Sequence, residues 1–193
     1  MKLSIVHQES YSRLELILRT LFGWIYIILP HFFVLFFIGL WGSILRFIAF
    51  WIVLFTGRYP ESMFEYQTQL LRWQIRVNAR ISNLVDDYPS FGLTATDDNV
   101  SLEVPYPERV SRGLLLLRIF FGVIYVIIPH FFILFFRIIW GSILTFLAFF
   151  VVLFTKRFPE SWHEFLVGTM RWNTRVTLYM WFMTDDYPPF SSK

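Results

Sequence analysis

Two histidines combine a versatile side chain with an unusual position. His31 and His130 each follow a proline within a long apolar run. An ionisable group in such a run is costly to bury and often functional, so one interpretation is a pair that accepts protons or binds a metal. Two histidines without a nearby acid make a poor metal site, however. The alternative, which we favour, is a neutral imidazole that bonds a carbonyl freed by the proline or lies near an aqueous interface.

Two acidic pairs, Asp86-Asp87 and Asp185-Asp186, each precede a Tyr-Pro dipeptide. Neighbouring carboxylates can bind a metal ion, but the remaining ligands of a recognisable metal site are missing here. We therefore favour ion pairs with arginines of the preceding helix, such as Arg72 and Arg76 in the first case. Such pairs would fix the segment after the helix against the helix itself.

Six arginines at matching positions form the most prominent polar group of the chain. They are Arg58, Arg72, Arg76, Arg157, Arg171 and Arg175. At the inner leaflet of a membrane, such groups could hold anionic lipid phosphates, with about 1 kcal/mol for each basic residue. They could equally orient the chain and form internal salt bridges, and both interpretations stay open. The net charge of only +3 argues against a nucleic-acid partner.

The composition predicts an integral membrane protein. Of the 193 residues, 56% are hydrophobic and 21% aromatic, and only 16% are charged. Soluble domains have roughly 25% charged residues. The absence of cysteine excludes disulfides, thiolate metal sites and cysteine nucleophiles. The polar N-terminus predicts no removable signal peptide, so the first apolar run should act as its own insertion signal.

The chain also contains an internal duplication. Matching segments are Pro30-His31-Phe32-Phe33 with Pro129-His130-Phe131-Phe132, Trp41-Gly42-Ser43 with Trp140-Gly141-Ser142, Arg72-Trp73 with Arg171-Trp172, and Asp86-Asp87-Tyr88-Pro89 with Asp185-Asp186-Tyr187-Pro188. The offset is the same throughout, so the alignment needs no gap. The two halves must therefore share a fold.

The duplicated unit resembles an uncharacterised bacterial membrane family, one of the "domain of unknown function" families. The resemblance rests on I-P-H, L-F-T-G-R-Y-P, R-W-x-x-R-V and T-D-x-Y-P-P-F, which run along nearly the whole chain. The second copy departs modestly, with Lys156 and Phe158 in place of Gly57 and Tyr59. The resemblance implies a protein of the bacterial inner membrane and carries no assigned activity.

The apolar run from Leu14 to Thr56 predicts a transmembrane hairpin. As one helix it would measure roughly 65 Å, against about 30 Å for a bilayer core. Gly39, Gly42 and Ser43 are expected to form the turn between two spans. Basic residues near the other ends predict a multi-pass protein with both termini in the cytoplasm. The alternative is one long bent span per copy, broken at Pro30 and Pro129 in turn, which would place the copies in opposite orientations.

After Pro60 the apolar residues recur at three- and four-residue steps, which predicts an amphipathic helix lying in the membrane interface. The expected fold is thus an all-α membrane protein of two repeats, each a hairpin followed by this helix. The first repeat is 1–91, with its hairpin at about 13–56 and its amphipathic helix at about 61–85. A polar linker spans 92–110, and the second repeat is 111–193, with hairpin 112–155 and helix 160–183. Residues 3–6 and 100–104 could pair as two short strands.

The sequence contains no catalytic, cofactor-binding or metal-binding motif, so we expect no enzyme and no cofactor. We favour a scaffold or accessory subunit of a larger inner-membrane complex, with anionic lipids and other proteins as partners. A lipid-handling protein, transporter or channel is the alternative, and a membrane-embedded enzyme is less favoured. One difference between the copies supports a partner: Arg80, Ser82 and Asn83 become Tyr179, Trp181 and Phe182.

Overall fold

The computed structural model describes all residues 1–193, which form two copies of one helical arrangement. The first half contains β1 (Lys2–Ile5), α1 (Arg13–Gly23), the π-helix η1 (Trp24–Ile28), α2 (Leu29–Thr56) and α3 (Glu61–Ile81). The second half contains β2 (Val100–Glu103), α4 (Arg112–Gly122), the π-helix η2 (Val123–Ile127), α5 (Ile128–Thr155) and α6 (Glu160–Met180). The predicted mainly helical fold with two repeat-like halves is confirmed.

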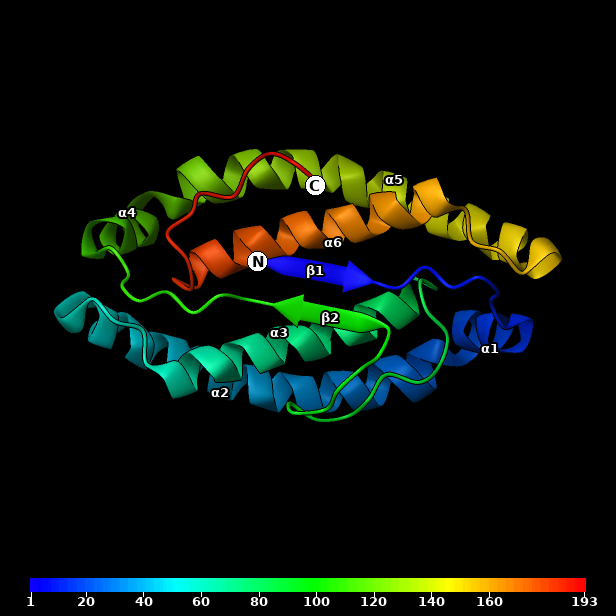
Figure 1. Cartoon of the computed structure of the whole chain (residues 1–193), viewed down its shortest axis with the longest axis horizontal. Coiled ribbons are helices and arrows are strands. Elements are labelled where there is room, and N and C mark those ends of the chain that lie inside the picture. Colours follow the sequence, from blue (N-terminus) through cyan, green and yellow to red (C-terminus); the bar gives the residue numbers. More distant parts are fainter.

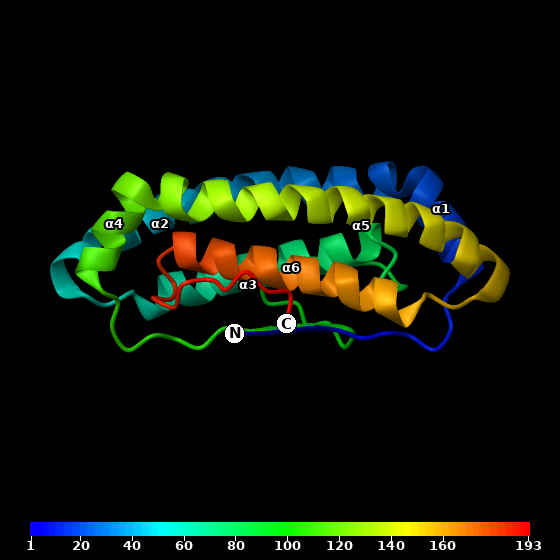
Figure 2. The same cartoon turned by 90° about the horizontal axis from the view of Figure 1, so that it is seen from above.

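The elements form three layers (Figures 1 and 2). The two long helices, α1–η1–α2 and α4–η2–α5, lie antiparallel in the first layer. The second layer holds α3 and α6, each packed along the long helix of its own half. The third layer is the β1–β2 ribbon, near which both termini lie (Figure 2). A half turn in the plane of Figure 1 exchanges the two halves.

The predicted hairpins are wrong, because each apolar run forms one continuous helix. The first helix extends from Arg13 to Thr56 and the second from Arg112 to Thr155. The glycine at position 42 permits close packing and does not mark a turn. A Cβ atom on Gly42 would lie only 3.1 Å from Leu70 Cδ2 of α3. The neighbouring Ser43 hydroxyl donates to the Gly39 carbonyl within the helix, at 3.0 Å.

Proline is accommodated in each long helix by a π-helical turn. Pro30 has no N–H, so it cannot donate to the carbonyl of Tyr26 as a helical residue normally would. Just before the proline the helix widens over Trp24–Ile28, where the Leu29 N–H donates to the Trp24 carbonyl. The same widening precedes Pro129 in the second half. The observed helix is therefore closer to the alternative of one long bent element.

The amphipathic helices α3 and α6 lie in the middle layer, where other parts of the protein contact them on more than one side. The apolar side of α3 packs against α2, and Leu70 and Trp73 are buried there. The side that carries its arginines is also covered, because β2 and the preceding linker pack on it. A helix with basic residues on one side can thus have both sides within the protein when main-chain carbonyls accept from the arginines.

The predicted pair of short strands is present. β1 and β2 are antiparallel, with Leu3 opposite Leu102 and Ile5 opposite Val100. These four side chains are buried beneath the ribbon, and the residues between them are exposed. The ribbon joins the halves, since β1 contacts α6 and β2 contacts α3.

Candidate functional site

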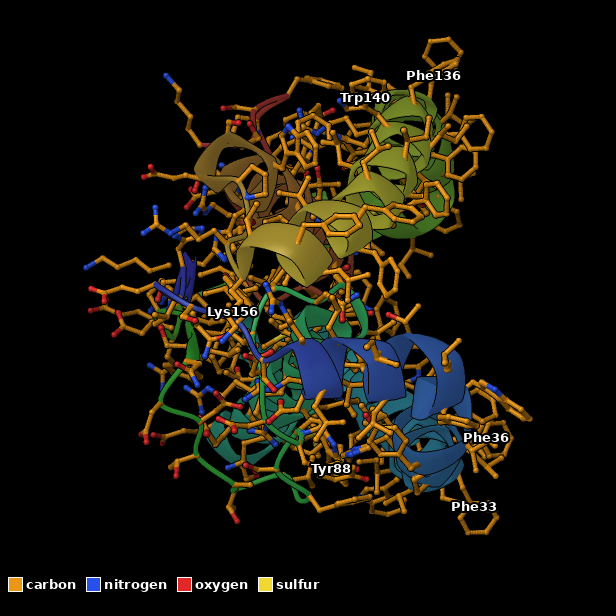
Figure 3. All side chains as sticks on the ribbon, turned by 90° about the vertical axis from the view of Figure 1, so that its right-hand side faces the viewer. Phe33, Phe36, Tyr88, Phe136, Trp140 and Lys156 are labelled. Carbon is orange, nitrogen blue, oxygen red and sulfur yellow. The ribbon has the colours of Figure 1, made fainter.

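The outward surface of the two long helices, which we call the apolar face, holds almost all exposed large hydrophobic side chains. The exceptions are Val6, Ile81, Tyr88, Phe91, Tyr106, Tyr187 and Phe190. In the end-on view of Figure 3, Phe33, Phe36 and Phe136 project from this face, whereas side chains with nitrogen and oxygen tips fill the opposite side. Both helices are long and apolar enough to cross a membrane.

His31 lies beneath the apolar face in a closed aromatic pocket. Its Nδ1 accepts a hydrogen bond from the indole N–H of Trp73, at 2.8 Å. Because an indole only donates, the imidazole is neutral and carries its proton on Nε2, which is buried without a partner. The ring stacks on Phe91, with 3.9 Å between centroids. The sequence suggested that this imidazole bonds the carbonyl freed by the proline. The structure shows no such hydrogen bond.

That carbonyl belongs to Tyr26, and its partner is the hydroxyl of Tyr88, which donates to it at 2.9 Å. The second half repeats the arrangement, with Tyr187 donating to the Tyr125 carbonyl at 2.9 Å. The tyrosine of the Tyr-Pro segment after each acidic pair thus supplies the hydrogen bond that this carbonyl lacks within the helix.

The second histidine, His130, lies in its own pocket. Its Nδ1 accepts from the Trp172 indole at 2.9 Å, and its ring stacks on Phe190 with 4.1 Å between centroids. Each histidine is enclosed by aromatic residues of its own half. The structure therefore does not bring His31 and His130 together.

The acidic pairs contact arginines other than the predicted ones. Asp86 accepts from the guanidinium of Arg19 at 3.2 Å, and its other oxygen accepts from the Ser12 N–H at 2.7 Å. Arg19, in α1, is buried and also donates to the Asn83 side chain and the Val85 carbonyl. These contacts fix the segment after α3 to α1. The predicted ion pairs with Arg72 and Arg76 are not formed.

The second half has the same arrangement, with Arg118 buried in α4 and paired with Asp185. The second residue of each acidic pair, Asp87 and Asp186, is exposed. Sequence reasoning did not identify Arg19 or Arg118 as candidates. The available signal was an arginine within an apolar helix, which requires a nearby acid.

Four of the six predicted arginines donate hydrogen bonds to main-chain carbonyls. Arg76 donates to the carbonyls of Ala95, Ser90 and Gly92 in the linker, and burial lowers its pKa below the ordinary value. Arg175 donates to Ser191 in the C-terminal segment.

The other two of these four arginines, Arg72 and Arg171, connect the strands to the helices. Arg72 donates to the Leu102 carbonyl of β2 and pairs with Glu65, whereas Arg171 donates to Leu3 of β1 and pairs with Glu164. Only Arg58 and Arg157 are exposed. The structure thus supports the internal role for four of the six arginines.

A histidine pair that the sequence did not suggest joins the N-terminus to α6. The rings of His7 and His163 lie 4.9 Å apart, and His7 Nε2 donates to the Phe158 carbonyl at 2.7 Å. Burial, together with the neighbouring His7, lowers the pKa of His163 to about 4. At the matching place in the other half stand Tyr106 and Phe64.

The structure groups no three His, Asp or Glu side chains that could hold a metal ion. The predicted residues other than the exposed Arg58, Arg157, Asp87 and Asp186 form hydrogen bonds or ion pairs with other side chains and with the main chain. The features that remain for interaction with another molecule are the apolar face and a cavity of about 840 Å³ between the two halves.

Comparison with known proteins identifies the repeated unit. No curated protein and no solved structure matches the chain. A family model described as a domain of unknown function, DUF4389, matches twice, at residues 13–92 and 115–192. Each match contains one long helix, one middle-layer helix and the Tyr-Pro segment beneath the long helix. The chain therefore belongs to the DUF4389 family and carries two copies of its domain.

Proposed function

We propose that this protein is a non-enzymatic scaffold that lies in one leaflet of the bacterial inner membrane. The long helices would insert their apolar face among the acyl chains, and the β ribbon would face the cytoplasm. The observation that carries the proposal is the separation of the surface into one apolar and one polar face (Figure 3). Proteins that lie in an interface bind through such a face.

The position of α3 and α6 favours an orientation in the membrane plane over a crossing. These helices run beside the long helices (Figure 2) and carry the exposed acids Glu61, Glu65 and Glu164. If the long helices stood along the bilayer normal, these charges would lie at the depth of the hydrocarbon core. A charge at that depth costs about 2.5 to 3.5 kcal/mol or more. Lying flat, the protein keeps all of them in water.

The distribution of charge and the position of the termini support the cytoplasmic leaflet. Both termini lie on the side of the β ribbon (Figure 2), and exposed arginines occur at the ends of the long helices. They are Arg13, Arg58, Arg112 and Arg157. Anionic lipids of the cytoplasmic leaflet attract basic residues near the surface, with about 1 kcal/mol for each. A single-leaflet protein with these residues at its rim therefore fits that leaflet.

A scaffold role is favoured because the buried histidine, arginine and aspartate side chains that the sequence pointed to bond to other groups of the protein. The ribbon and the exposed residues of α3 and α6, among them Glu61, Glu65 and Glu164, offer polar groups that another protein could bind. The test is isolation from native membranes in mild detergent. A stable stoichiometric complex supports the scaffold. If the protein runs alone, and in liposomes moves an ion or a lipid, the transport alternative replaces it.

The depth of insertion is tested with single cysteines, since the chain has none of its own. Phe36→Cys and Phe136→Cys, labelled with a fluorophore, should be quenched by lipids that carry a spin label on the acyl chain. Thr96→Cys should be quenched only by a water-soluble reagent. Equal quenching at all three positions by the aqueous reagent would show that the apolar face is not inserted.

A further inference from the structure

The two regions in which the halves face each other differ from one another. The cavity of about 840 Å³ lies between α1 and α5. One wall comes from α1, η1 and the end of α3, and the other from α5 and α6. Its volume falls within the range of about 300 to 1,000 Å³ that is typical of small-molecule sites.

The pseudo-symmetry of the molecule supplies an internal comparison, because the equivalent place between α4 and α2 is filled. There Trp181 lies under the guanidinium of Arg46, at 4.2 Å. Phe182 packs against Phe50, with 6.1 Å between ring centroids. At the corresponding positions the cavity is lined by Ser82, Asn83 and Thr145. The small and polar residues of the first copy thus create the cavity.

The cavity contains one arginine, Arg137, that forms no ion pair. Arg137 of α5 donates through Nε to the Thr169 hydroxyl at 3.1 Å and through Nη2 to the Phe165 carbonyl at 3.3 Å. Its guanidinium also stacks on the Phe165 ring, at 4.2 Å. No carboxylate lies within ion-pair distance, and Nη1 has no partner within the chain. At the matching position the first copy has Ile38, so the charge is particular to this cavity.

A second polar group in the cavity is also incompletely paired. Asn83 is only 6% exposed, and its side-chain oxygen accepts from Arg19 Nε at 2.7 Å. The structure gives its amide nitrogen no partner. This nitrogen is not one of the unpaired polar atoms that are shut off from solvent, so it is accessible and can donate to a molecule in the cavity. Arg137 and Asn83 therefore offer donors from opposite walls of one cavity.

The apolar part of the lining lies on the long helices, with Leu21 and Trp24 on one side and Ile138 and Phe146 on the other. All four are exposed and belong to the apolar face. The polar part is completed by Asn173 of α6, in the middle layer. The cavity therefore has an apolar opening towards the acyl chains and polar groups towards the headgroup side of the same leaflet.

We infer that this cavity binds one anionic phospholipid of the leaflet in which the protein lies. Its phosphate would accept from Arg137 and Asn83, and its acyl chains would leave between the long helices into the bilayer. The inference rests on the proposed insertion of the apolar face. This lipid site differs from the exposed arginines at the rim, because it depends on the half-buried Arg137 and on the small residues at positions 82 and 83.

Native mass spectrometry of the full chain in detergent tests the inference, with phosphatidylglycerol and phosphatidylcholine as probes. The wild type should retain one phosphatidylglycerol per chain in preference to phosphatidylcholine. Arg137→Ile, which copies the first repeat, should weaken this retention at least roughly ten-fold, equivalent to about 1.4 kcal/mol. Ser82→Trp with Asn83→Phe, which copies the second repeat, should fill the cavity and have the same effect.

Arg46→Thr is the matched control, because it removes an arginine from the filled place and should leave lipid retention unchanged. Equal retention of both lipids, retention by both cavity variants, or an equal loss in Arg46→Thr would overturn the inference. Thermal melting identifies any variant that does not fold, and the two cavity variants act independently. Flotation with vesicles is measured in parallel. Failure of the wild type to float would contradict the proposed insertion. Lipid binding in the cavity is judged from the mass measurement alone.

Discussion

The side chains shared by the two halves form matched sets of contacts beneath the long helices. In the first half the imidazole of His31 accepts from Trp73 and stacks on Phe91, and Tyr88 donates to the carbonyl left free by the proline. These residues are far apart in the sequence. Their contacts hold α2, α3 and the segment after α3 together, which gives each residue of the repeated motif a physical role.

The indole–imidazole hydrogen bond predicts a specific loss of stability. Trp73→Phe removes the donor to His31 Nδ1 and leaves both ring nitrogens of a fully buried imidazole without a partner. We expect the free energy of unfolding to fall by about 1 to 3 kcal/mol. Denaturant titration in detergent measures it. Trp172→Phe should lose a similar amount, and Trp51→Phe, at an exposed position, should change little.

The pair of His7 and His163 predicts a dependence of stability on pH. Because the pKa of His163 in the folded protein is about 4, the unfolded chain binds the proton first as the pH falls below about 6.5. Stability should therefore decrease from pH 7 to pH 5, with a contribution of about 2 kcal/mol from this residue, and stop decreasing on its account below about pH 4. The facing charged groups are His7 and Glu164.

The variant that isolates this effect is His163→Phe, because phenylalanine occupies the matching position 64. It should remove most of the pH dependence between pH 7 and pH 5, as followed by denaturation at each pH. His7→Tyr, which copies Tyr106, should leave a dependence due to His163 itself. An unchanged pH profile in His163→Phe would show that other groups control acid stability.

At the scale of elements, the continuity of the long helix makes opposite predictions for two glycines. Gly39 has open space where a Cβ would be, so Gly39→Ala should stabilise the helix by about 0.5 to 1 kcal/mol. Gly42 lies against Leu70, so Gly42→Leu should destabilise the protein by about 1 to 3 kcal/mol through overpacking. A hairpin turn at this place predicts a loss for Gly39→Ala. Melting curves of the two variants in detergent distinguish these outcomes.

The sequence predicted the duplication, the helical content and the strand pair, because each depends on local pattern or on exact repetition. It did not predict the course of the long helix. Glycine beside Trp41 is compatible with a turn or with close helix packing, and only the presence of α3 against Gly42 decides between them. The ion pairs were also missed, since Arg19 and Asp86 meet only after α1 and the segment following α3 are placed.

At the scale of the whole molecule, the arrangement in layers gives each surface a distinct environment. The aromatic long helices form one side, and the ribbon and termini lie on the other (Figure 2). The half turn that relates the copies keeps both apolar surfaces on the same side (Figure 1). In the proposed orientation, the exposed arginines at the ends of both antiparallel long helices would therefore lie at the rim of the same leaflet.

The accessibility of single cysteines from each side of the membrane distinguishes insertion into one leaflet from two crossings in each copy. Single cysteines at Ser43 and Ser142, which are exposed and lie where the hairpin turns were predicted, are compared with Thr96→Cys in right-side-out and inverted membrane vesicles. A protein lying in the cytoplasmic leaflet keeps positions 43 and 142 among acyl chains, so a membrane-impermeant maleimide should modify neither from either side. Thr96→Cys should react only in inverted vesicles. Solubilisation in detergent should make all three cysteines reactive, which controls for intrinsic reactivity. Crossing hairpins would instead expose positions 43 and 142 at the periplasmic surface, and their modification in right-side-out vesicles would contradict the single-leaflet orientation.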